Sequence, residues 1–471
     1  MQAAVGGPYP LRGGNQVVPW IDGLPFYTRL AAAFRAARRR IWAIVSFIEP
    51  GFCFPDGTCW WDLLDECAGR GVDVRVLFWR NPGFRTDHVF RGGPEEREFL
   101  RRRGAAFVAR WDSSGEDPTH CHHQKGYVID AQEADASAFI GGMVLSRSTL
   151  AAPGHRHGRE KHDVFLELRG PAVVDAEHNF VQRWNLARID EAAPPWPDAA
   201  RAGALAWSTR APPVCGAVPV QLARTIRAGV YPGRTPVVGV GEFDSGAGEA
   251  TIREQYLAAF AAARRTIYLE NQHPGELGLL TALAAALARG VEVVMVVPGE
   301  PMPAIVAASR ACAGWVAGDP PHRYGSTFAG LAALAEAHNF TLAALARSDV
   351  GEAAGTWRHR EIYTHAKLCV VDGAWATIGS ANLVDLSLLP DHTELNAALW
   401  SREVATQLVC GLVAEHCELR EPDDRAALAS FARVARASRA SLLAGGPVLA
   451  GCYALDARSY AQGPALTRAG R

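Results

Sequence analysis

The sequence predicts an α/β fold made of two similar halves, each a sheet with helices on both faces. Two observations predict this: four pairs of related segments recur in the same order, and helix and strand patterns alternate through both parts of the chain. The 471 residues are enough for two or three domains. With 49% hydrophobic and 21% charged residues, the composition is that of a globular protein and excludes a disordered one.

The first two pairs predict a helix followed by a strand. Residues 32–42, AAFRAARRRIW, resemble residues 258–268, AAFAAARRTIY, and each segment has the pattern of a helix end, an arginine pair and a strand start. Residues 70–79, RGVDVRVLFW, resemble residues 289–298, RGVEVVMVVP. In both members of this second pair a glycine stands where a helix should end, and a strand pattern follows.

The other two pairs predict short strands that carry polar groups at their starts. Residues 122–130, HHQKGYVID, resemble residues 364–372, THAKLCVVD, and each precedes a further short strand. Residues 161–170, KHDVFLELRG, resemble residues 392–401, HTELNAALWS, and each has an acid near its beginning. Because the order is kept while the loops vary, we predict a duplicated domain.

The domain boundaries follow from composition. We place the first half at residues 1–190 and the second at 214–445, with a linker rich in Pro and Ala at 191–213. The pattern of residues 423–444 predicts a terminal helix. We expect residues 446–471 to form a lightly packed C-terminal tail.

Lysine is scarce in this chain. Lys and Arg total 48, yet Lys occurs only at positions 125, 161 and 367, and the 49 acidic residues bring the net charge to −1. This balance argues against a nucleic-acid coat or a polybasic membrane tether, both of which need excess positive charge. Since Arg supplies nearly all of the positive charge, each remaining Lys is a candidate for a role that Arg cannot fill.

The chain shows no secretory signal pattern at its start and no run of 18 apolar residues. The ten cysteines form no CxxC pair and match no zinc or disulfide framework. We therefore expect a protein that is cytoplasmic or peripheral to a membrane, with export by a route that needs no signal left open.

One motif, His-x-Lys-x4-Asp, occurs twice and uses two of the three lysines. On a strand, residues two apart share a face, so the His and Lys of each motif can enter one pocket. The Asp lies five residues beyond the Lys and faces the other way, which favours a supporting role. The two copies are His123, Lys125 and Asp130, and His365, Lys367 and Asp372.

Such a pocket has the groups for phosphoryl chemistry. One imidazole can attack as a nucleophile while the other protonates the leaving group. Two ammonium groups can hold the phosphate oxygens and stabilise the charge that develops in the transition state. A compact ammonium suits this geometry better than a planar guanidinium fork.

The doubled motif resembles that of the phospholipase D superfamily, and the resemblance extends over most of residues 14–420. It implies two halves related by a pseudo-twofold axis, around a single metal-independent phosphodiesterase site that needs no cofactor. The other segments that carry the resemblance are 14–23, 139–145, 162–185, 220–229, 267–274 and 379–395.

The resemblance also implies roles for individual residues. His123 matches the nucleophile and His365 the general acid, with Lys125 and Lys367 as phosphate clamps. The family motif groups Asp130 and Asp372 with these catalytic residues. The remaining matches are two acids that orient the imidazoles, Asp163 and Glu394, and three positions that contact the substrate phosphate, Gly142, Ser380 and Asn382.

The predicted function is cleavage of phospholipid head-group esters through a phosphohistidine, with water or an alcohol as acceptor. The substrate would lie in a membrane or micelle surface, and we expect a monomer without a stable nucleic-acid partner. A cardiolipin-synthase-like phosphatidyltransferase is an alternative, although such members generally carry N-terminal membrane helices and this chain shows none. A nuclease, or a non-catalytic lipid- or phosphate-binding protein, is a further alternative, and the near-neutral charge and the intact doubled motif weigh against these two.

Four other features have more than one interpretation. Residues 120–123, HCHH, resemble a metal cluster, but neighbouring strand residues diverge, and we do not predict a metal site. We predict that residues 154–162, GHRHGREKH, form a solvated loop. Asn271 and Gln272 contact phosphate or are structural strand-end amides. Four tryptophans either form a lip at a lipid interface or lie in the core: Trp20, Trp60, Trp61 and Trp79.

Overall fold

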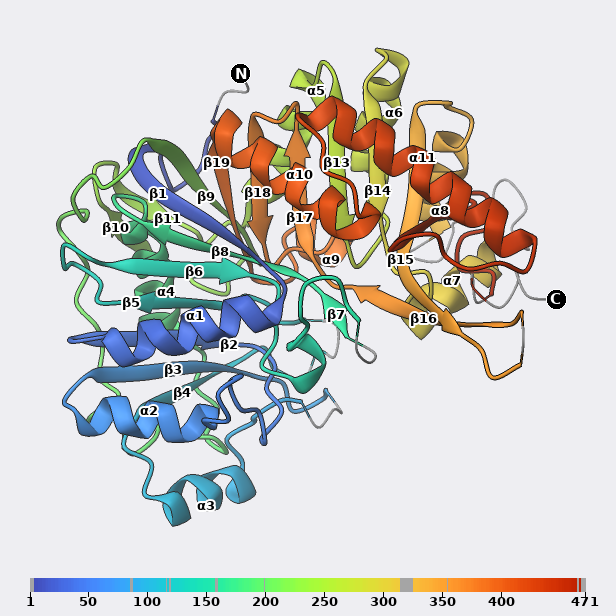
Figure 1. Ribbon diagram of the computed structural model, residues 1–471. Helices are drawn as coiled ribbons and strands as arrows, with labels where there is room; N and C mark the ends of the chain where they lie inside the picture. The colour runs from blue at the N-terminus through green and yellow to red at the C-terminus, as the bar shows by residue number, and fades with distance from the viewer. Residues whose placement is uncertain are drawn as a thin grey trace.

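The computed structural model has the predicted α/β architecture, in which most strands form one large mixed sheet, and Arg234–Val237 and Gly241–Asp244 form a separate two-stranded sheet. It describes residues 4–84, 88–115, 117, 120–156, 160–198, 200–313, 325–353, 355–463 and 466. Figure 1 shows two groups of strands side by side, one from the N-terminal part of the chain and one from the C-terminal part.

The first group of strands combines parallel and antiparallel pairing. Its first three strands are parallel to one another, and the later neighbours pair antiparallel. The order across the sheet is β4 (Val108–Ser113), β3 (Asp73–Arg80), β2 (Arg40–Val45), β5 (Gly126–Ile129), β6 (Ser137–Gly141), β8 (Val164–Arg169) and β1 (Arg12–Ile21).

The second group has the same strand order and the same pattern of directions. The four pairs of related segments lie on corresponding strands of the two groups. The order is β15 (Phe340–Val350), β14 (Glu292–Val296), β13 (Thr266–Asn271), β17 (Lys367–Val371), β18 (Trp375–Gly379), β19 (Glu394–Trp400) and β9 (Val218–Ile226).

The groups join through β1 and β9, which pair antiparallel. At the far edge of the second group, β15 also pairs with β16 and β20. The shorter elements are a 3-10 turn η1 (Arg147–Thr149), β7 (Lys161–His162), β10 (Arg234–Val237), β11 (Gly241–Asp244), β12 (Glu249–Ala250), β16 (Trp357–Thr364) and β20 (Cys452–Ala454).

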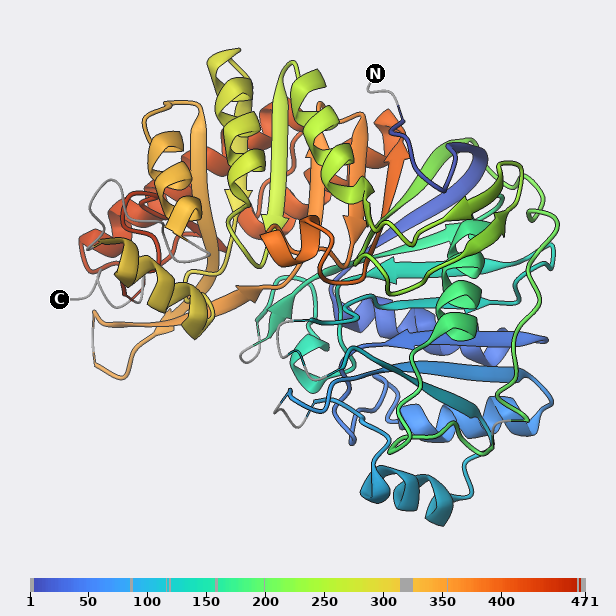
Figure 2. The same cartoon turned by 180° about the vertical axis from the view of Figure 1, so that it is seen from behind.

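Helices cover both faces of each group. In the first group, α1 and α2 lie on one face and α4 on the other; in the second, α10 and α11 lie opposite α5, α6 and α8 (Figures 1 and 2). The helices are α1 (Gly23–Ala36), α2 (Trp60–Gly69), α3 (Pro94–Arg103), α4 (Val173–Leu186), α5 (Thr251–Ala262), α6 (Leu277–Ala288), α7 (Pro303–Ala313), α8 (Gly325–Leu334), α9 (Asp385–Leu388), α10 (Arg402–Cys417) and α11 (Asp424–Leu443).

Three large apolar clusters hold these layers together, because each helix buries one face against the sheet. One cluster extends through both groups and includes α4, α10 and α11. Trp60, Trp61 and Trp79 are at most 2% exposed. The core interpretation of these three tryptophans is therefore correct, and they form no lip at a lipid surface.

The predicted helix ends are confirmed. Helices α2 and α6 end just before Gly71 and Gly290, which have φ of 87° and 86°. Glycine adopts this left-handed conformation without the steric cost that a side chain brings, so it turns the chain from the helix into the next strand.

The C-terminal segment is better packed than predicted. Strand β20 pairs with β15, and Cys452 and Tyr453 are buried. The described part of the segment that was expected to be a lightly packed tail thus contributes a strand to the sheet. The terminal helix is α11, as predicted.

Among the described residues, no helix is both long enough and apolar enough to cross a bilayer.

Candidate active site

The two motifs meet where the two groups of strands touch. His123 and Lys125 directly precede β5, while His365 precedes and Lys367 begins the corresponding strand β17. The backbone N–H of His123 donates to the Thr393 carbonyl at 2.9 Å, and that of His365 to the His162 carbonyl at 2.8 Å. Each histidine is therefore fixed by a segment of the other half.

The side chain of each motif histidine also contacts an acid of the other half. His123 Nδ1 lies 3.0 and 3.1 Å from the two carboxylate oxygens of Glu394, and His365 Nδ1 lies 2.6 Å from Asp163 Oδ2. A carboxylate at Nδ1 holds the proton there and leaves Nε2 free to act as a base or nucleophile. The structure thus brings together both predicted histidines and both predicted orienting acids.

Glu394 is held as an ion. Ser380 Oγ and Ser387 Oγ donate hydrogen bonds to its two oxygens at 2.5 and 2.6 Å. Burial alone would raise its pKa, but the interaction with His123, a hydrogen bond from His392 and the charge of Lys125 hold the pKa of Glu394 below its usual range. Burial lowers the pKa of His123 to about 4, against the opposing effect of Glu394.

Ser380 was predicted to contact the substrate phosphate. Its side chain is completely buried, donates to Glu394 and accepts the Leu395 N–H at 3.0 Å. The structure therefore uses Ser380 to position Glu394, and its partner Ser387 was missed because no motif marks it.

The second acid has a different environment. Burial raises the pKa of Asp163 to about 7, although the charge of Lys367 and the Val164 N–H lower it. Gly142 packs against this group: a Cβ atom there would lie 2.7 Å from Lys367 Cδ and 2.9 Å from Asp163 Oδ1. Gly142, a predicted phosphate contact, thus leaves room for Lys367 and Asp163.

Both motif lysines are buried in the pocket. Lys125 Nζ donates to the His123 carbonyl at 2.6 Å, and Lys367 Nζ donates to the His365 carbonyl and, at 3.2 Å, to Gln272 Oε1. Burial lowers the pKa of Lys125 to about 8 and that of Lys367 to about 7.

The third lysine also lies at this site. Lys161, on β7, is the register partner of Tyr363, and the charge of Asp163, two residues on, acts on it. Burial lowers the pKa of His365 well below its usual value, and the charges of Lys367, Lys161 and Lys125 lower it further. The charges of all three lysines of the chain therefore act on one histidine of the site.

The sequence left open whether the amide side chains of Asn271 and Gln272 contact phosphate or are structural. Asn271 is structural, because its side-chain oxygen accepts the backbone N–H of Leu383 and of His273. Gln272 contacts Lys367 and donates to Tyr363 Oη at 3.0 Å. Asn382 is 7% exposed, and its Oδ1 has no hydrogen-bond partner among the described residues.

The two motif aspartates do not enter the pocket. Asp130 accepts the backbone N–H groups of Arg38, Arg39 and Arg40 at 2.7 to 2.9 Å. Asp372 accepts those of Arg264, Arg265 and Thr266 at 2.7 to 3.0 Å. Grouping them with the catalytic residues was wrong, and the supporting role that the strand argument favoured is the one observed.

Asp130→Asn should lower stability and leave catalysis nearly intact. Asn tolerates the φ of 48° at this position, but it offers one acceptor oxygen and no charge to three N–H donors. We expect a loss of roughly 1–3 kcal/mol in the free energy of unfolding, measured in urea. Asp372→Asn is the matched variant. A hundredfold loss of turnover at unchanged stability would contradict this assignment.

Sequence reasoning missed several neighbours of the pocket. The ring of Phe47 lies 6.0 Å from that of His123 and 5.4 Å from Lys125 Nζ, and the ring of His392 lies 6.1 Å from His123. Burial and the charge of Lys367 lower the pKa of His273 to about 3. Phe47 and His273 lie outside the four pairs of related segments, and His392 begins one segment at the position where the other copy has Lys161, so no shared pattern marked these residues.

Of the four residues 120–123, His122 has its Nδ1 2.9 Å from Thr393 Oγ1, and His123 belongs to the pocket formed by the two motifs.

In the run 154–162, which was predicted to be a solvated loop, His155 and His162 are 2% and 0% exposed. That prediction was wrong for these two residues.

The chain resembles known proteins over much of its length. Residues 256–412 match a family model described as cardiolipin synthase, PLD-like domain. Cardiolipin synthase A of Pseudomonas putida is 24% identical over 425 residues, which cover 88% of this chain and 71% of that protein. Phospholipase D gamma 1 of Arabidopsis thaliana is 26% identical over 208 residues, which cover 33% of this chain and 24% of that protein. The chain thus spans about a quarter of the plant relative.

Among solved structures, the phosphatidylserine synthase of Haemophilus influenzae Rd KW20 has the same fold, with a TM-score of 0.50 and 14% identity over 88% of each chain. The match of residues 256–412 to this family model, and the similarity to proteins named phospholipase D and cardiolipin synthase, support membership of the phospholipase D superfamily.

Proposed function

We propose that this enzyme transfers the phosphatidyl group of a phospholipid to a hydroxyl acceptor through a phosphohistidine, hydrolysis being the case in which the acceptor is water. The observation that carries the proposal is that each of the two histidines is paired with an acid from the other half of the chain. Each imidazole has a carboxylate at Nδ1, and a buried lysine donates to the backbone carbonyl of each histidine.

In the first step, Nε2 of His123 attacks the phosphorus, and the bond from phosphorus to the head-group oxygen breaks. The leaving oxygen takes a proton from the protonated form of His365, which Asp163 at Nδ1 and the anionic phosphate favour against the lowered pKa of this ring. Glu394 balances the positive charge that His123 acquires, which is why an ionised acid behind this ring matters.

In the second step, the acceptor hydroxyl gives its proton to His365 while its oxygen attacks the phosphorus. The bond from phosphorus to nitrogen breaks, and both histidines return to their starting states. Lys125 and Lys367 hold the non-bridging oxygens through both steps, and their positive charge stabilises the charge that accumulates there.

The acceptor distinguishes two versions of this reaction. Phospholipase D activity uses water, whereas a cardiolipin-synthase-like enzyme uses the hydroxyl of a second lipid. The relative named cardiolipin synthase A aligns with 88% of this chain, whereas the plant phospholipase D aligns with 33%. This breadth favours lipid-to-lipid transfer as much as hydrolysis.

The test is incubation of the purified protein with vesicles of phosphatidylcholine and phosphatidylglycerol, with and without ethanol. Mass spectrometry would detect phosphatidic acid after hydrolysis, phosphatidylethanol after transfer to ethanol, and cardiolipin after transfer to a second phosphatidylglycerol. We expect at least one of these products with the wild type and none with His123→Ala.

Absence of all three products with the wild type would overturn the proposal. Degradation of single-stranded DNA by the wild type, lost in His123→Ala, would instead favour a nuclease.

Lys161→Met should weaken substrate binding more than turnover. The variant keeps an unbranched side chain one atom shorter and removes one of the three positive charges proposed to surround the phosphate. We expect KM to rise about tenfold, which corresponds to about 1.4 kcal/mol. Lys161→Arg is the matched control and should retain most of the affinity. Unchanged KM in Lys161→Met would show that this lysine does not contact the substrate.

We also propose that residues 1–190 and 214–445 arose by duplication and are related by a pseudo-twofold axis. The common strand order and the crossed pairs at the pocket support this.

A further inference from the structure

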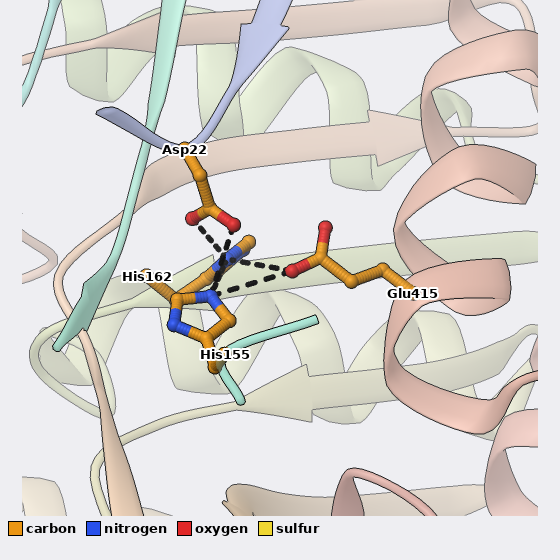
Figure 3. Close-up of side chains that lie close together, drawn as sticks. All are labelled: Asp22, His155, His162 and Glu415. Atoms are coloured by element: carbon orange, nitrogen blue, oxygen red, sulfur yellow. Dashed lines mark hydrogen bonds and ion pairs between the residues drawn. The ribbon is translucent and has the colours of Figure 1, made fainter. Parts of the chain in front are cut away.

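A second cluster of polar side chains lies behind the pocket, on the opposite side of the strand that carries Asp163. It consists of Asp22 after β1, His155 in the loop before β7, His162 on β7 and Glu415 on α10 (Figure 3). The first three are at most 2% exposed, and the Glu415 side chain is 9% exposed.

The ligand-type atoms of these residues converge on one point. His155 Nε2 lies 3.3 Å from His162 Nδ1, 3.3 Å from Glu415 Oε1 and 3.0 Å from Asp22 Oδ2. His162 Nδ1 lies 2.9 Å from Asp22 Oδ1 and 3.9 Å from Glu415 Oε1. Tetrahedral zinc with bonds of about 2.0–2.1 Å places its ligand atoms about 3.3 Å apart, so the spacing fits such an ion.

Hydrogen bonds alone account poorly for this arrangement. Asp22 Oδ2 has no hydrogen-bond partner among the described residues, although a ring nitrogen lies 3.0 Å away. Asp22 also stands before α1 and makes no side-chain cap for that helix, the usual role of Asp at such a position. Its carboxylate instead faces the two histidines.

The backbone is also held in an uncommon conformation at two of the four residues. Asp22 and His155 have φ of 64° and 47°, in the region that side chains disfavour. Such conformations persist when the surrounding structure demands them, often to aim a side chain at a site.

The outer contacts are those expected of metal ligands. His162 Nε2 lies 2.8 Å from Glu270 Oε2, and that acid also receives Tyr268 Oη at 2.5 Å and faces His416 Nε2 at 2.9 Å. A carboxylate at the far nitrogen of a histidine fixes the ring and directs its other nitrogen to the metal. Two carboxylates and two neutral imidazoles would also match the charge of a divalent cation.

We propose that Asp22, His155, His162 and Glu415 bind one structural Zn²⁺ ion that joins the two halves behind the pocket. Four protein ligands fill a tetrahedral shell, so the ion would act on structure and leave phosphorus chemistry to the histidines. Three ligands belong to the first half and Glu415 to the second. His162 directly precedes Asp163, so the ion would fix the strand that presents Asp163 to His365. This inference does not depend on the identity of the lipid substrate.

The test is metal analysis of the full chain produced with zinc in the medium. We expect about one zinc per chain in the wild type and in His338→Ala, which removes an exposed histidine elsewhere. His155→Ala and the milder Glu415→Gln should lose most of the metal. Removal of zinc by a chelator should lower Tm by roughly 5 °C or more, and added Zn²⁺ should restore it.

Cobalt supplies a second readout, since Co²⁺ in a tetrahedral site absorbs visible light strongly. The metal-free wild type should gain this band with one equivalent of Co²⁺, and Glu415→Gln should show a weakened or shifted band. A wild type that holds no metal and gains neither Tm nor the band would overturn the proposal and leave a purely ionic network. Full zinc occupancy in both variants would equally overturn it.

Discussion

His123→Asn will stop the reaction before any covalent intermediate forms, whereas His365→Asn, with a substrate whose leaving group needs no proton, will stop it afterwards. His123 faces an ionised carboxylate that two serine hydroxyls hold in place, so its Nε2 is the better nucleophile. Removing a nucleophile of this kind costs roughly 10⁴-fold or more in turnover, and removing a general acid costs about 10²–10⁴-fold.

A p-nitrophenyl phosphodiester separates the two roles, because nitrophenolate leaves without taking a proton. With this substrate, His365→Asn should accumulate the phosphohistidine, since its breakdown needs His365 to activate the acceptor. Intact-protein mass spectrometry under alkaline quench would detect the added mass, and His123→Asn should show none. The reverse pattern would assign the nucleophile to His365.

The pH profile offers an independent check on the same histidine. With the pKa of His123 lowered to about 4 by burial, the imidazole is neutral and able to attack at pH 7. Nucleophilic attack needs the deprotonated ring, so kcat/KM should fall as the pH drops through about 4. A loss of activity that begins near pH 6.5 would contradict the shift.

The fold and the central residues of the pocket were predictable because their signals are local. A run of apolar residues predicts a buried strand, and a glycine after a helix pattern predicts the end of that helix. The His and Lys of each motif are recognised because they are two residues apart. These patterns predicted both strand groups and all four motif residues that enter the pocket. Residues five apart on a strand point to opposite faces, and this also predicted that Asp130 and Asp372 support the fold, although the family motif groups them with the catalytic residues.

The partners across the halves were not predictable from local patterns. His123 and Glu394 are 271 residues apart, and His365 and Asp163 are 202 apart. The sequence identified both acids by resemblance, but only the packing of the two halves decides which acid serves which histidine. The same holds for Ser380, whose hydroxyl turns to Glu394 rather than to the pocket.

The run 154–162 was misjudged for a related reason. All nine of its residues are polar or glycine, which is typical of a solvated loop. His155 is buried because the chain turns back on itself there and Glu415, on a helix 260 residues further on, closes over it. Three histidines in one short polar run were the signal that could have raised the question of a metal.

Lys125→Arg should lose about 100-fold or more in kcat/KM, even though it conserves charge. Lys125 is 2% exposed, its ammonium donates to the His123 carbonyl at 2.6 Å, and it lies 5.4 Å above the ring of Phe47. The longer, planar guanidinium does not fit this slot without displacing the segment before β5 that carries His123. A loss of 100-fold corresponds to about 2.7 kcal/mol of transition-state stabilisation. Arg38→Lys, at an exposed position, is the control and should be nearly neutral.

The pH dependence of kcat/KM also tests whether the two motif lysines hold the phosphate. Burial lowers the pKa of Lys367 to about 7 and that of Lys125 to about 8, and both must be protonated to hold an anionic phosphate. The kcat/KM of the wild type should therefore fall as pH rises through 7 to 8. The kcat should stay high to a more alkaline pH, because the bound anionic phosphate favours the protonated lysines. Arginine does not titrate in this range, so the residual activity of Lys125→Arg should lack the second part of the fall. A wild-type profile that stays flat from pH 7 to 9 would show that the lysines keep their ordinary pKa. The scarcity of lysine in the chain would then have no explanation in the chemistry of this pocket.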